Sequence, residues 1–219
     1  LPGALGLAAV LLSHNILGLI TLYLLLLTFA VFLFLFFIKK IKALKVFSVL
    51  KIMVFGLSLS AFFLLPAVFE KDFTRVNSLT TGGSNYQKHF VSLSQLWDSP
   101  WGFGGSAEGL ADGLAFKIGK FHLISSIITL FFLKKRYFIL NSILFLLFVL
   151  SLFLMVEKSS FIYSLLPFFA FIQYPWRFLN FAVFSLSLMP VSLFYLKNRF
   201  LNITLCIFFI TGILLIYSK

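Results

Sequence analysis

The segment Ile16–Ile38, with the sequence ILGLITLYLLLLTFAVFLFLFFI, contains no charged residue and is followed directly by Lys39 and Lys40. An α-helix rises about 1.5 Å per residue, so roughly 20 apolar residues cross a hydrocarbon core of about 30 Å. This segment is long enough for such a crossing, and the lysines mark where the chain leaves the hydrocarbon. It therefore predicts a transmembrane helix.

The composition of the whole chain extends this prediction. Of the 219 residues, 61% are hydrophobic and 11% are charged, and the mean hydropathy is +1.09. About a quarter of an ordinary soluble chain is charged, and a soluble domain of this length has too little interior for so much apolar surface. We predict an all-α, polytopic transmembrane helix bundle of the plasma membrane, with residues 1–219 forming a single membrane domain. Because the chain begins with Leu1 inside an apolar run, we expect it to be a fragment of a longer protein.

The net charge of +12 is distributed in a way that favours a membrane topology over nucleic-acid binding. A nucleic-acid site would need the bases on one folded surface. Instead they form three groups without acidic residues, which is typical of cytoplasmic loops. All six acidic residues then lie on the outer side. The three basic groups are Lys39, Lys40, Lys42, Lys45 and Lys51; Lys134, Lys135 and Arg136; and Lys197 and Arg199.

Apolar runs separated by these polar groups predict the helices. Proline cannot continue the helical hydrogen-bond ladder, so we expect the third helix to end at Pro66, and we expect a kink at Pro190 in the sixth. The single cysteine, Cys206, excludes a disulfide framework within the chain. About seven helical segments are predicted, over residues 1–12, 16–38, 46–65, 121–133, 138–156, 179–196 and 200–217.

Two further segments complete the predicted topology. Residues 69–120 are the only long polar segment, and we predict that they form an extracytoplasmic loop. Residues 161–178 are apolar, but Pro167 and Pro175 divide them into pieces too short to span. We expect this segment to lie in the outer membrane interface.

Candidate chemistry is concentrated in the loop, in residues 92–113. Asp98, Glu108 and Asp112 are three carboxylates within one short span that is rich in Gly and Ser. Such carboxylates can serve as a general base or hold a divalent metal ion. Alternatively they are solvated or form ion pairs. The candidate partners for such ion pairs are Arg75, Lys88, Lys117 and Lys120. The sequence indicates no organic cofactor.

Aromatic and polar residues at the predicted outer side also allow two interpretations each. Trp97 and Trp101 resemble interface anchors, but their flat rings also suit stacking on sugars. His14 and Asn15 stand between two apolar runs, where they either cap a helix or face a cavity.

The segment Phe171–Phe181, FIQYPWRFLNF, places Arg177 in apolar surroundings beside Trp176. At an interface the arginine stem can lie along apolar surface while the guanidinium meets lipid phosphates, and Trp176 is then an ordinary interface residue. A bidentate contact to the phosphate of a substrate is the alternative, because the guanidinium matches phosphate geometry.

Four motifs together resemble a family. They are SHN at 13–15, AFFLLPAVFEK at 61–71, HFVSLSQLWDSPWGFGGSAEGLADGLAFKIGKFHL at 89–123, and FIQYPWRFLNF at 171–181. Nearly the whole chain is similar to bacterial membrane proteins of the pyruvoyl-tetrahydropterin-synthase-related membrane domain, which resemble GT-C glycosyltransferases.

This resemblance implies an all-helical bundle whose outer loops cover a site at membrane level. It also implies transfer of a sugar from a polyprenyl-phosphate donor, with the membrane lipid and the lipid-linked sugar as partners. GT-C enzymes typically carry a catalytic aspartate on the first outer loop, so we expect that residue upstream of this chain. We expect Arg177 to meet the phosphate, together with Lys117 or Lys120. The expected site comprises Asp98 and Asp112 for catalysis, and His14, Asn15, Trp97, Trp101, Lys117, Gln173, Trp176 and Arg177 for substrate or phosphate binding.

Two other functions remain open at this stage. A transporter of lipid-linked saccharides would need polar residues along a path through the helices, and the helices from Phe121 onward contain few besides Ser and Thr. A non-catalytic assembly protein would use the outer loop to bind a partner.

Overall fold

The computed structural model describes residues 1–75, 78, 80–110, 112–131, 137–166, 168–195 and 199–217. This part of the chain is 79% helical and contains no strand, so the all-α prediction is confirmed. It divides into two compact units, Leu1–Ser84 and Asn85–Lys219, and each is considered by itself. The basic group 134–136, Lys197 and Pro167 lie outside the described residues. The single membrane domain stays a prediction.

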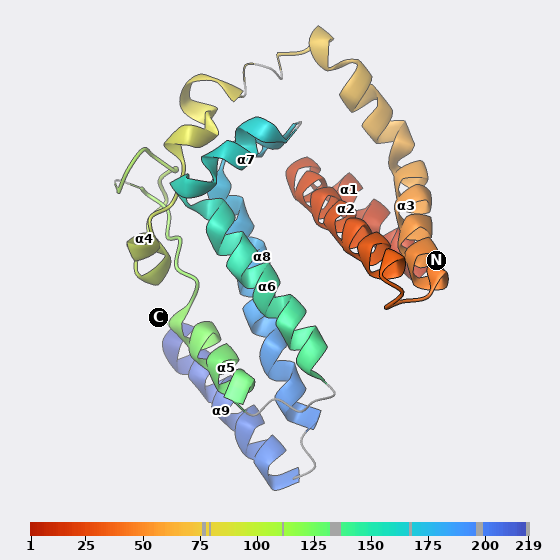
Figure 1. The fold of residues 1–219 in the computed structure, drawn as a ribbon. Coiled ribbons are helices and arrows are strands. Elements are labelled where there is room, and N and C mark those ends of the chain that lie inside the picture. The colour runs from red at the N-terminus through yellow and green to blue at the C-terminus, as the bar shows by residue number, and fades with distance from the viewer. Residues whose placement is uncertain are drawn as a thin grey trace. The chain divides into compact units, whose positions relative to one another are not determined.

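The first unit packs three helices side by side (Figure 1). They are α1 (Pro2–Ser13), α2 (Asn15–Phe37) and α3 (Ala43–Phe69), and a 3₁₀ turn at Lys71–Phe73 follows. Positions separated by three and four residues fall on one face of a helix. The buried face of α3 carries Val46, Val49, Met53, Gly56 and Ser60, and it packs on the buried face of α1.

Glycine allows α1 and α3 to approach closely. A Cβ atom at Gly56 would lie 2.6 Å from Cδ2 of Leu7 on α1. Small residues at such contacts are typical of helices that associate in membranes.

The second unit contains most of the polar loop, from Asn85 onward, and the four apolar helices described next. In Figure 1, α6 (Phe138–Met155) lies against α8 (Leu179–Leu188), and α5 (Lys120–Phe131) lies against α9 (Arg199–Tyr217). The hydroxyl of Ser126 on α5 donates a hydrogen bond of 2.8 Å to the carbonyl of Leu186 on α8. The shorter α-helices of the second unit are α4 (Leu93–Trp97) and α7 (Ser160–Leu165). The 3₁₀ turns are Gly82–Ser84 in the first unit and, in the second, Tyr86–Lys88, Glu157–Ser159, Phe169–Ile172, Pro175–Phe178 and Met189–Tyr195.

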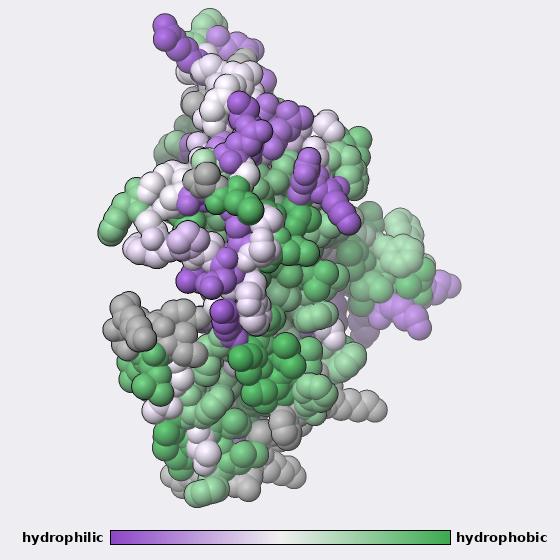
Figure 2. All heavy atoms as spheres, turned by 90° about the vertical axis from the view of Figure 1, so that its left-hand side faces the viewer, coloured by the Kyte–Doolittle hydropathy of each residue, from purple (hydrophilic) through white to green (hydrophobic). Residues whose placement is uncertain are grey.

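Among the described residues, four helical segments are long and apolar enough to cross a membrane, namely Asn15–Phe37, Ala43–Phe69, Phe138–Met155 and Pro175–Leu193. Their large apolar side chains face outward, as on α6, where Ile139 is 71% and Leu146 is 67% exposed. Figure 2 shows hydrophilic side chains gathered over the loop and hydrophobic ones over the helices of the second unit. Such large exposed apolar surfaces are typical of contact with lipid. The count of seven segments, the sidedness and the interfacial position of 161–178 stay predictions.

The structure contradicts the predicted end of the third helix at Pro66. We expected the third helix to end before Pro66, but α3 continues to Phe69. That prediction is wrong because a proline removes only its own N–H, and the following turn can still close: Glu70 N donates to Pro66 O at 2.8 Å. At Pro190 the α-helix instead tightens into the 3₁₀ turn Met189–Tyr195.

Candidate functional site

The loop of the second unit is organised by the short helix α4. Ser92 caps it, because its hydroxyl accepts from Gln95 N at 3.4 Å, while Gln95 Oε1 accepts from Ser92 N at 2.9 Å. This reciprocal arrangement is a capping box and satisfies two N–H groups that a helix start leaves without partners. Gln95 is thereby held, buried, with its amide nitrogen directed at the remainder of the loop.

Asp112 fastens the distal part of the loop onto α4. Its Oδ2 accepts from Gln95 Nε2 at 2.6 Å, and its Oδ1 accepts from Ala107 N at 2.8 Å. Hydrogen bonds to an ionised carboxylate are stronger than neutral ones. Both carboxylate oxygens of Asp112 therefore hold the loop closed.

Glycines allow the two arms of this loop to meet backbone against backbone. Gly104 N donates to Gly113 O at 3.1 Å, and Gly113 N donates to Gly105 O at 3.0 Å. A Cβ atom at Gly113 would lie 2.5 Å from Gly104 Cα, a separation that real Cβ atoms do not adopt. The Gly-rich composition therefore serves close packing of the loop, and it places Asp112 beside α4.

Asp98 forms an ion pair at the end of α4. Its Oδ1 lies 3.2 Å from Lys117 Nζ. The hydrogen bond and charge of Lys117, with a further contribution from the charge of Lys120, hold the pKa of this exposed carboxyl below its ordinary value. Lys120 Nζ also lies 5.0 Å from the ring centroid of Trp97. The ion-pair alternative that the sequence left open for Asp98 is the one that the structure adopts.

Asp98 and Asp112 meet at one pocket of about 200 Å³. We call it the acidic pocket. A water molecule occupies about 30 Å³ in the liquid, so the space admits a small polar molecule. Glu108 does not line it, and Trp101 packs against Phe103 at a centroid distance of 5.8 Å instead. The lining residues are Ser94, Gln95, Asp98, Ser99, Pro100, Leu110, Asp112 and Leu114.

A second group of polar and aromatic side chains surrounds the ring of Tyr174. The His89 ring lies 4.6 Å from it, the Trp176 ring 5.7 Å, and the Arg177 guanidinium carbon 4.9 Å. His89 Nδ1 is also 2.9 Å from the hydroxyl of Ser106. We call these five residues the Tyr174 cluster. Cation–π and edge contacts of this kind fix the orientation of the rings.

Arg177 holds an unusual turn in this cluster. Tyr174 N donates to Ile172 O at 2.6 Å across Gln173, whose φ is 62° and ψ −46°. This is a classic γ-turn, which is rare and strained. Arg177 Nη1 donates to Ile172 O at 2.5 Å and to Gln173 Oε1 at 3.4 Å. The guanidinium thus stabilises a backbone conformation that a glutamine seldom adopts.

The side chains of Trp176 and Arg177 carry hydrogen-bond donors next to this turn. In the part of the chain that the structure describes, the buried Nε1 of Trp176 has no hydrogen-bond partner. The described hydrogen bonds of the Arg177 side chain all use Nη1. Buried polar groups in proteins are nearly always hydrogen-bonded, so an indole N–H without a protein acceptor calls for one from water or a ligand.

The acidic pocket and the Tyr174 cluster adjoin each other through consecutive residues. Ser106 contacts His89, and the next residue, Ala107, donates to Asp112. Sequence reasoning placed Asp98, Asp112, Lys117, Gln173, Trp176 and Arg177 in the site, and all of them lie in this region or beside it. It missed His89, Ser106 and Tyr174. Tyr174 stands in the motif that drew attention to Arg177, whereas no spacing signal marks the His89–Ser106 pair.

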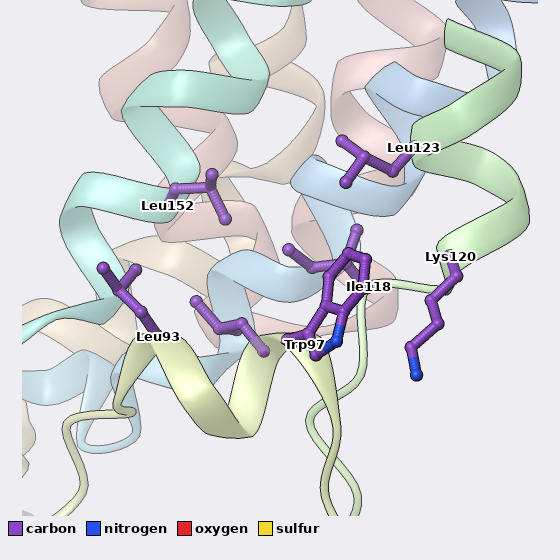
Figure 3. Close-up of a pocket in the computed structure, with 8 residues that line it drawn as sticks. Leu93, Trp97, Ile118, Lys120, Leu123 and Leu152 are labelled. Carbon is purple, nitrogen blue, oxygen red and sulfur yellow. The ribbon is translucent and has the colours of Figure 1, made fainter. Parts of the chain in front are cut away.

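The other expected site residues have separate surroundings. Trp97 lies with Lys120, Leu93, Leu123 and Leu152 around a small apolar hollow beneath α4 (Figure 3). In the first unit, His14 caps α2, since its Nδ1 accepts from Leu17 N at 3.3 Å. The structure therefore favours helix capping for His14, and both His14 and Asn15 are exposed.

Among the described residues, no three His, Cys, Asp or Glu side chains lie close enough to hold a metal ion together. The possible divalent metal consequently stays a prediction without a ligand set. Comparison of the chain with models of known protein families, with curated proteins and with solved structures found no match.

Proposed function

We propose that the chain belongs to an integral membrane glycosyltransferase-like protein, which takes a sugar from a polyprenyl-phosphate donor at the outer face of the membrane. The observation that carries this proposal is that Asp98 and Asp112 line one small pocket, which adjoins the Arg177-containing cluster through Ser106 and Ala107. Sugar transfer needs groups for hydroxyls and groups for a phosphate within one region.

In the proposed reaction an acceptor hydroxyl attacks the anomeric carbon of the donor. The bond from that carbon to the phosphate oxygen breaks, the polyprenyl phosphate leaves, and the hydroxyl proton passes to a base. The departing phosphate needs positive charge or N–H donors. Arg177 would supply the positive charge, since its described hydrogen bonds use Nη1, and the buried Nε1 of Trp176 would supply an N–H donor.

The depth of Arg177 suits this role. It lies in the first turn of the candidate spanning segment Pro175–Leu193 and is half-buried. The phosphate of a polyprenyl-linked sugar lies at the level of lipid headgroups, so an arginine at a helix start would meet it there.

The two aspartates are better suited to holding a sugar than to removing its proton. The lowered pKa of Asp98 keeps the carboxylate ionised at neutral pH and makes it a weak base. Both oxygens of Asp112 already accept hydrogen bonds from the loop. We therefore assign Asp98 to binding sugar hydroxyls and Asp112 to shaping the pocket, and the base would be a further residue.

The experiment measures sugar transfer from a polyprenyl-phosphate donor and binding of decaprenyl phosphate, with full-length protein in lipid nanodiscs. A bidentate charge-assisted contact contributes about 1.5–3 kcal/mol, so Arg177→Ala should weaken decaprenyl phosphate binding by about 10- to 150-fold. Arg177→Lys should lose less, since it keeps the charge and one donor for Ile172 O.

Arg75→Lys in the first unit is the matched control, and it should leave binding unchanged. Thermal unfolding of each variant separates loss of the ligand contact from loss of the γ-turn that Arg177 holds. A folded Arg177→Ala protein that binds decaprenyl phosphate and transfers sugar like the wild type would refute the phosphate role.

A further inference from the structure

A larger groove lies outside the acidic pocket, between the loop and the end of α6. It has a volume of about 740 Å³ and belongs wholly to the second unit. We call it the α6 groove. Its apolar wall contains Val149, Leu152 and Phe153 of α6, together with Leu93 of α4.

Four charged side chains line the same groove. Lys88 and Glu108 come from the loop, and Glu157 and Lys158 come from the turn after α6. All four are exposed and described by the structure, and no ion pair joins any two of them. Two cations and two anions thus share one groove without pairing with each other.

The apolar wall continues beyond the charged part of the groove. Leu93 and Leu152 also line the hollow of about 120 Å³ beneath α4, together with Trp97, Ile118 and Leu123. In Figure 3 these side chains point into the space between α4, α5 and α6. A ligand that filled both would have a polar head among the four charges and a hydrocarbon chain beneath α4.

We propose that the α6 groove binds a zwitterionic phospholipid whose headgroup carries a primary ammonium, as phosphatidylethanolamine does. Lys88 and Lys158 would meet the phosphate, and Glu108 and Glu157 would meet the ammonium. Charges of both signs favour this occupant over a purely anionic lipid, which the two carboxylates would repel. A quaternary ammonium carries no N–H, so it cannot donate hydrogen bonds to the carboxylates.

The test is native mass spectrometry of the purified chain in detergent, with phosphatidylethanolamine, phosphatidylglycerol or phosphatidylcholine of identical acyl chains. We expect tightest binding of phosphatidylethanolamine. Exposed charge contacts contribute about 0.2–1 kcal/mol each. The double variant with Glu108→Gln and Glu157→Gln should therefore bind phosphatidylethanolamine roughly 2- to 30-fold more weakly and lose the preference over phosphatidylglycerol.

Lys88→Gln with Lys158→Gln should weaken binding of all three lipids, because each contains a phosphate. Glu70→Gln and Lys45→Gln, at exposed positions of the first unit, are the matched controls and should change nothing. Equal binding of the three lipids, tighter binding of phosphatidylglycerol, or an unchanged preference in the double glutamate variant would overturn the proposal. Decaprenyl phosphate competing better than phosphatidylethanolamine would overturn it as well. Since none of these charges belongs to the acidic pocket or the Tyr174 cluster, sugar transfer is tested separately.

Discussion

Replacing Asp112 by asparagine should loosen the loop, because the neighbouring amides cannot adapt. The asparagine oxygen can still accept from Ala107 N, but its NH₂ group then faces Gln95 Nε2, which is also a donor. A flip of the Gln95 amide would restore that contact and would remove Oε1 from Ser92 N. The flip would also take Nε2 away from the carbonyl of Gly109, to which it donates at 3.4 Å, so at least one hydrogen bond is lost in either case.

The size of the effect follows from this count. Losing one hydrogen bond in a half-buried loop costs about 1–2 kcal/mol, which is roughly a 5- to 30-fold increase in the population of the open loop. Asp112→Ala removes both bonds and should cost about 2–3 kcal/mol, or roughly 30- to 150-fold. Hydrogen exchange of peptides covering residues 104–113 measures both changes, because the hydrogen-bonded amides of Gly104, Ala107 and Gly113 exchange only when the loop opens.

Glu108→Gln is the control in the same loop, since the Glu108 side chain takes part in none of the loop hydrogen bonds described above. Exchange in that variant should match the wild type. If Asp112→Asn and Asp112→Ala left exchange across residues 104–113 unchanged, Asp112 would not be the residue that closes the loop.

Three further predictions concern the second unit. Gly113→Ala should speed exchange of the same peptides at least as much as Asp112→Ala, because its Cβ would overlap the facing backbone; unchanged exchange would show that the arms do not meet there. The buried Tyr163 phenol donates to Leu154 O at 2.8 Å, and its burial raises its pKa. The neutral phenol therefore contributes its full stability below the unfolded-state pKa of about 10, and this contribution is lost as the pH rises further. Tyr163→Phe should lower the unfolding free energy by about 1 kcal/mol near neutral pH. Ultraviolet titration of the wild type should find at least one tyrosine that does not ionise near pH 10, and unfolding should release it. Lys117 lowers the pKa of Asp98, so the ion pair persists at neutral pH and is lost as the pH falls below the ordinary aspartate range. Lys117→Gln should therefore raise the pKa of Asp98, as measured by NMR of its carboxyl carbon. An unchanged pKa in that variant would contradict the pairing.

Part of the candidate site was predictable from the sequence. The carboxylates of the loop and the arginine of FIQYPWRFLNF are conspicuous in an apolar chain. Lys117 could be named as one of four candidate ion-pair partners for the acids, because opposite charges attract at any sequence separation, but the pairing with Asp98 itself could not be chosen. The His89–Ser106 contact could not be predicted, because the two residues are 17 positions apart and join through the path of an irregular loop. The γ-turn at Gln173 was equally hidden, since glutamine carries no preference for positive φ.

The amino-acid sequence by itself determined that the chain is helical and apolar enough to enter a membrane. These properties depend on the length and composition of continuous segments such as 16–38, and hydrogen bonds within each helix satisfy its backbone. The tertiary structure alone decided which polar groups meet. Asp112 reaches Gln95, and Arg177 reaches Ile172 O, only because glycine contacts and tight turns route the chain between them. The energy of those contacts depends on geometry between separate segments, which no local pattern of residues encodes.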